Sequence, residues 1–94
     1  MSELLSSFKN RMHISHSSED AYLRDILRAS FEDIVSKCGQ FNLESNYRGR
    51  ELVMERSRYV YNDAVEYFND NFLSQIHSFG INNLPDEVDE DVSK

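Results

Sequence analysis

VMERSRYVYNDAVEYFNDNF, which runs from Val53 to Phe72, groups its apolar residues at helical spacing. This spacing predicts one continuous helix over about 49–71. Its apolar positions cover an arc of about 160°, whereas a surface helix needs an arc of about 100° or slightly more. The wide arc predicts two neighbours for this helix. One is the preceding helix of the same chain; the other is either the short terminal helices or, as we favour, another subunit.

The opposite side of this predicted helix is polar. Glu55 and Arg58 on that side have the spacing of an ion pair within one helix. Arg56 lies at the edge of the apolar arc, where a guanidinium needs a carboxylate partner. The candidate partners on the preceding helix are Asp25, Glu32 and Asp33.

Three other helices are predicted around this one. A short helix covers about 3–12, a long one begins near Ser17 or Ser18 and ends at Cys38 before Gly39, and a short one covers about 72–81. The last of these should turn Phe72, Leu73, Ile76 and Phe79 inward; the alternative for this segment is an extended arm. Segment 40–49 has no helical period, and we predict a loop held by Phe41, Leu43 and Tyr47.

The predicted fold class is therefore all-α. It is an antiparallel hairpin of two long helices flanked by short N- and C-terminal helices, with a disordered acidic tail. The predicted division is a helical domain over 1–84 and an acidic C-terminal tail over 85–94, because five acidic residues fall within Asp86–Val92.

Composition excludes several classes of protein. A net charge of −7 argues against a basic nucleic-acid-binding surface and against docking on an anionic membrane. No apolar run approaches the roughly 20 residues that span a bilayer. The single cysteine, Cys38, excludes an internal disulfide. With no signal-like N-terminus, the sequence predicts synthesis and retention in a cytoplasm.

No pattern of catalytic or metal-binding residues is present. His13 and His16 form an H-x-x-H pattern in a serine-rich loop, so we expect exposed loop histidines and no metal site. Cys38 ends a helix, where the dipole disfavours a thiolate, and we expect a small core residue. We predict no cofactor, no metal, no catalytic residue and no enzymatic activity.

Three stretches carry a resemblance to a known family. They are FKNRMHISHSSEDAYLRDILRAS (Phe8–Ser30), ELVMERSRYVYNDAVEYF (Glu51–Phe68) and NFLSQIHSFG (Asn71–Gly80). In this order and spacing, the chain resembles the small head–tail connector (adaptor) proteins of long-tailed bacteriophages. The resemblance covers about Leu4–Gly80.

This resemblance implies a structural virion protein at the head–tail junction, assembled in the host cytoplasm. It implies a homo-oligomeric ring of about twelve subunits that binds the portal protein. Such a ring extends the DNA channel, through which DNA passes without sequence-specific binding. It also docks the next head-closure or tail-completion protein.

Two sets of residues are predicted to make these contacts. We predict a subunit interface on the outer flank of the long helix, formed by Met54, Arg58, Tyr61, Val65 and Phe72. We predict that the 40–49 loop and the acidic tail contact partner proteins. The docking residues are Phe41, Tyr47, Arg48, Arg50, Asp86 and Glu87.

The main alternative is a small acidic regulatory module, such as a DNA-mimicking inhibitor or an antitoxin-like protein. It would use surface carboxylates to bind one basic protein and would be a monomer or dimer. A further alternative, a metal-dependent enzyme using the loop histidines, would require stoichiometric metal.

Overall fold

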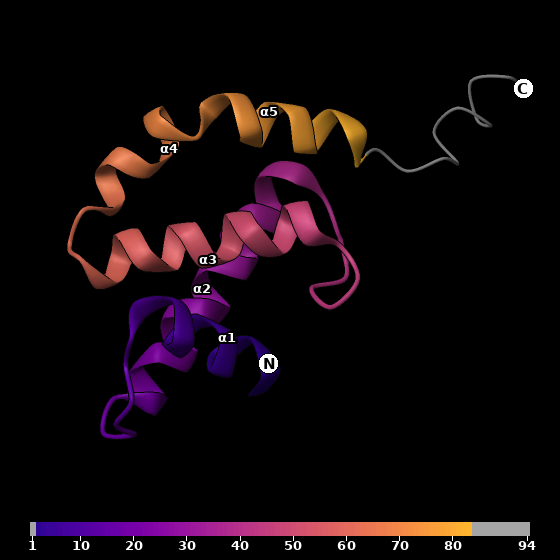
Figure 1. Cartoon of the computed structure of the whole chain (residues 1–94). Helices are drawn as coiled ribbons and strands as arrows, with labels where there is room; N and C mark the ends of the chain where they lie inside the picture. The colour runs from indigo at the N-terminus through magenta and orange to yellow at the C-terminus, as the bar shows by residue number, and fades with distance from the viewer. Residues whose placement is uncertain (1, 84–94) are drawn as a thin grey trace, which may run out of the picture.

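The computed structural model describes residues 2–83, and these form helices joined by short loops (Figure 1). No strand occurs within this range. The prediction of an all-α protein is therefore confirmed. The elements are α1 (Ser2–Met12), α2 (Asp20–Cys38), α3 (Tyr47–Tyr61), the 3₁₀ helix η1 (Val65–Tyr67), α4 (Phe68–Asn71) and α5 (Leu73–Asn82).

The helix predicted over 49–71 is interrupted, and the prediction of one continuous helix is wrong. α3 ends at Tyr61, and Asp63 adopts a left-handed backbone with φ of 60°. The Ala64 N–H donates to the Tyr59 carbonyl at 2.8 Å, and the Asp63 N–H donates to the Val60 carbonyl at 3.0 Å. These two bonds form a Schellman motif, which closes a helix. Aspartate tolerates the left-handed conformation better than most residues, so no glycine is needed.

The interruption returns the chain onto α3 and divides the apolar arc between two facing elements. Tyr59 of α3 meets Phe68 and Phe72 edge to face, each with ring centroids 5.7 Å apart. Phe68 and Phe72 stack on each other at 4.9 Å. Much of the apolar surface that predicted a second subunit is therefore covered inside the protomer.

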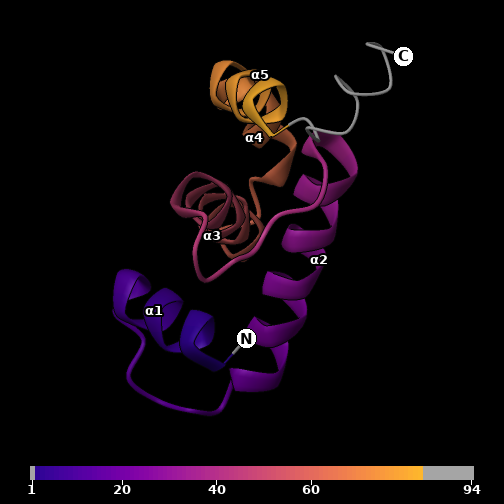
Figure 2. The same cartoon turned by 90° about the vertical axis from the view of Figure 1, so that its right-hand side faces the viewer.

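α2 is the helix on which the others pack. Its buried residues repeat at three- and four-residue spacing, and α1, α3 and α5 all contact it. Figure 2 shows these three helices following one another along α2. There α3 is seen nearly end-on while α2 rises along the picture, so the two helices cross steeply. The predicted side-by-side antiparallel hairpin is not confirmed.

The loop between α2 and α3 is held by one aromatic ring. Phe41 meets Phe31 and Phe79 edge to face, with centroids 5.3 and 5.1 Å away. The loop leaves α2 through Gly39, whose φ of +94° and ψ of 171° suit only glycine. Phe41 and Leu43 pack against the core, as predicted. Tyr47 does not, because its side chain is 79% exposed.

The predicted acidic tail, with its disorder and its boundary after residue 84, lies outside the described residues.

Gly49→Ala should destabilise the protein. A Cβ on Gly49 would overlap the Phe41 ring, which cannot move freely between Phe31 and Phe79. Overpacking of about 1–3 kcal/mol should outweigh a helix-propensity gain of up to about 1 kcal/mol. Urea unfolding followed by circular dichroism should show a net loss of about 1–2 kcal/mol.

Gly80→Ala is the matched control. Its Cβ would meet Cys38 atoms at ordinary contact distances of 3.7–3.8 Å, inside a helix. It should leave stability unchanged or raise it by up to about 1 kcal/mol. Equal stability of the two alanine variants would contradict the packing assigned to Phe41.

Candidate functional site

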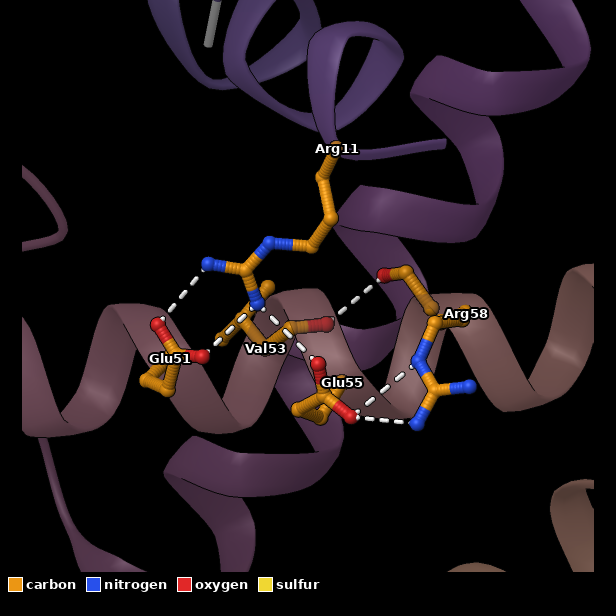
Figure 3. Close-up of polar contacts among 6 residues, drawn as sticks. Arg11, Glu51, Val53, Glu55 and Arg58 are labelled. Carbon is orange, nitrogen blue, oxygen red and sulfur yellow. Dashed lines mark hydrogen bonds and ion pairs between the residues drawn. The ribbon is translucent and has the colours of Figure 1, made fainter. Parts of the chain in front are cut away.

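An ion-pair network joins α1 to the outer side of α3 (Figure 3). Arg11 donates to both carboxylate oxygens of Glu51, at 2.7 and 3.0 Å, and to Glu55 at 3.0 Å. Arg58 donates to the other oxygen of Glu55 at 2.7 and 3.1 Å. The predicted Glu55–Arg58 pair is thus confirmed, and the network fixes α1 against α3.

Local structure explains why these side chains meet. Arg11 lies in the last turn of α1, where the helix dipole favours a cation. Glu51, Glu55 and Arg58 share one face of α3 at spacings of four and three residues. The hydrogen bond from Arg11, together with its charge, lowers the pKa of the Glu51 carboxyl below its usual value.

A second ion pair joins α3 to α2. The Arg56 Nε lies 3.1 Å from Asp33 Oδ2, and its Nη1 donates to the buried Ser30 hydroxyl at 3.1 Å. Asp33 also binds Lys37, which donates to Asn69 at 2.7 Å. The prediction of an α2 carboxylate for Arg56 is confirmed, and Asp33 is the partner.

The predicted partner-docking residues fall into three groups. Tyr47 and Arg48 are exposed in the first turn of α3, and Arg50 is partly buried there, donating to the Ser7 hydroxyl at 2.9 Å. Phe41 is instead packed into the aromatic cluster of the loop. Asp86 and Glu87 lie outside the described residues.

Two grooves flank the start of α3. One lies between α1 and α3, and the other lies between α3 and α5. Tyr47, Arg50 and Met54 line the first, and Arg48, Leu52 and Phe79 contribute to the second. The exposed ring of Tyr47 therefore stands beside concave surface.

The predicted subunit-interface residues do not form one exposed strip. Met54 is 5% exposed, so it offers little area to another subunit. Tyr61 is partly buried and donates to Glu19 at 2.7 Å, which raises the pKa of its phenol. Phe72 is partly buried in the aromatic stack. Val65 and the side chain of Arg58 keep more surface, 38% and 40% exposed.

Sequence reasoning missed part of the exposed apolar surface. Leu73 was predicted to face inward but is 50% exposed, and Tyr67, at helical spacing within the predicted apolar arc, is 58% exposed. A continuous helix would have carried Tyr67 into the apolar arc, but the turn at Asp63 changes its direction. Tyr22 and Ile81 are also exposed, at 51% and 70%.

The histidines and the cysteine considered for metal binding and catalysis lie in separate surroundings. His16 contacts the Ser18 hydroxyl at 2.8 Å in an exposed loop. Cys38 is buried, and that burial raises the pKa of its thiol. Within residues 2–83, no three His, Cys, Asp or Glu side chains gather where they could hold a metal ion. In the same range, no helix has the length and apolar character needed to cross a membrane.

Comparisons of the chain with protein-family models, curated proteins and solved structures give no match. Conclusions about function therefore depend on the residues described above. Among those residues, exposed apolar side chains lie at Tyr47 at the start of α3, around Val65, Tyr67 and Leu73 after its end, and singly at Tyr22 and Ile81.

Arg11→Met should destabilise the protein at pH 7 by about 0.5–1 kcal/mol, because Glu51 is largely exposed. A carboxyl whose pKa is lowered on folding stabilises the protein above its ordinary pKa, and this stabilisation is lost as pH falls through the lowered value. The cost of Arg11→Met should therefore shrink below about pH 4.5. Urea unfolding of both proteins between pH 7 and pH 3 measures it.

Glu51→Gln supplies the control background. There the Arg11→Met substitution should lose most of its pH-dependent cost, leaving the contribution of Glu55. A cost that stayed constant from pH 7 to pH 3 would contradict the role assigned to the Arg11–Glu51 pair.

Proposed function

We propose that this chain is a structural subunit of the head–tail junction of a long-tailed bacteriophage. Copies of it would form a ring beneath the portal. The observation that carries this proposal is the exposure of apolar side chains at two separate places on one small helical protomer, besides the single exposed residues Tyr22 and Ile81. Tyr47 stands at one place, and Val65, Tyr67 and Leu73 stand at the other.

The two places lie at opposite ends of α3. This helix has 15 residues, so its ends are about 22 Å apart. Figure 1 shows η1 following the end of α3 that is remote from the 39–46 loop. Rings are built from heterologous contacts, which need two different surfaces on each subunit. Tyrosines suit such contacts because an apolar ring carries a polar tip.

Charge is consistent with the same role. Each copy carries a net charge of −7, so a ring of many copies is strongly acidic. An acidic channel repels phosphates and lets DNA pass without being retained. In this proposal the ring prolongs the portal channel and presents a docking face to the head-closure or tail-completion protein.

Electron microscopy of the purified full-length chain tests the proposal, over a range of concentrations and with or without the portal protein encoded by the same genome. We expect closed rings, either of the chain alone or seated on the portal. Mass photometry of the same samples counts the copies. A monomer or dimer under every condition, portal included, would overturn the proposal and favour the acidic regulatory module.

A further inference from the structure

The two exposed apolar surfaces are bordered by opposite charges, and we propose that they bind each other in neighbouring copies of this chain. The start surface consists of Tyr47, Arg48 and Arg50. The end surface consists of Val65 and Tyr67 with the acidic residues Asp63, Glu66 and Asp70. This inference deepens the proposed function and relies on it only for the closure of the ring.

The start surface is an exposed tyrosine between two arginines. Tyr47 is 79% exposed, and neither Arg48 nor Arg50 makes an ion pair with any residue in 2–83. Glu44 is the only carboxylate in segment 44–50. The next one, Glu51, is already bound by Arg11. Arg48 and Arg50 therefore flank Tyr47 as cations that have no ion-pair partner within residues 2–83, while Glu3 and Glu44 line a pocket together with Arg50.

The end surface has the opposite sign. Asp63, Glu66 and Asp70 are exposed, and none of them pairs with a basic side chain of the described range. Segment 62–71 contains no lysine or arginine. Lys37 of α2 reaches this segment at Asn69, and it also binds Asp33. The residues next to Val65 and Tyr67 therefore carry a net negative charge.

These two surfaces have the makeup of an interface whose apolar centre is enclosed by complementary charge. Two start surfaces would oppose arginine to arginine, and two end surfaces would oppose carboxylate to carboxylate. Repulsion therefore selects contact between unlike ends. The shallow groove between α1 and α3, lined by Tyr47, Arg50 and Glu51 among others, lies beside the start surface and is open to the η1 turn of the next copy.

Mixing two single variants tests the pairing. Tyr47→Ser should disable only the start surface, and Tyr67→Ser only the end surface. Both side chains are mostly exposed, so circular dichroism should show an unchanged fold. Tyr22→Ser is the matched control, since Tyr22 is 51% exposed on α2 and belongs to neither surface.

Wild type and Tyr22→Ser should form species larger than dimers in analytical ultracentrifugation. Each of the other two variants should associate at least about tenfold more weakly. An equimolar mixture of Tyr47→Ser and Tyr67→Ser should form heterodimers and stop there, because one intact pair of surfaces remains. Arg48→Glu combined with Glu66→Arg in one chain should restore association that each reversal alone weakens.

Three results would overturn the inference. They are a wild-type monomer up to about 1 mM, self-association of either serine variant at the wild-type level, and a mixture of the two that stays monomeric. Rings that form on a portal despite such results would leave the proposed function standing. Head-to-tail filaments that never close would support the inference and count against the ring.

Discussion

The turn that ends α3 is the constraint on which the rest of the structure depends. Asp63 takes the left-handed conformation, and the hydrogen bonds from Ala64 and Asp63 close the helix behind it. A non-glycine residue in this conformation costs roughly 1–2 kcal/mol. Phe68, which the turn brings back against Tyr59, is 1% exposed. Burial of one such ring contributes about 1.5–3 kcal/mol, enough to offset the strained residue.

The same turn decides which surfaces the protomer hides and which it offers. A continuous helix would have displayed Phe68 and Phe72 on a wide apolar arc. The reversal instead stacks them on each other beside α3 and places α5 against α2. Val65 and Tyr67 lie in η1 between the two packed stretches, so they remain exposed. Packing of Phe68 and Phe72 against α3 thus leaves Val65 and Tyr67, in the turn before them, exposed to solvent.

The difference between what the sequence could and could not predict follows from the range of each interaction. The end of the long helix before Gly39 and the Glu55–Arg58 pair are local features, and the structure confirms them. A carboxylate partner for Arg56 on α2 was predictable because a guanidinium at an apolar edge needs one, but the choice of Asp33 among three candidates was not. The turn at Asp63 was missed because its helix-ending residue is not glycine and the apolar spacing continues through it.

The candidate site was predictable in composition but not in arrangement. Tyr47, Arg48 and Arg50 were identified from the sequence, and they lie together at the start of α3. Phe41 was placed with them, yet its ring is needed between Phe31 and Phe79. Hydrophobic periodicity does not reveal whether Phe41 or Tyr47 packs into the core. That choice depends on contacts with α5, which is distant in sequence.

Net charge and local charge act over different distances, and this difference allows an acidic protein to self-associate. At physiological ionic strength the screening length is about 8 Å. Repulsion between the net charges of −7 acts mostly across longer distances, so salt removes much of it. Arginines and carboxylates that meet across a contact lie within that length and keep their attraction. In the proposed contact between copies, arginines at the start of α3 and carboxylates after its end would therefore attract although the total charges of the copies repel.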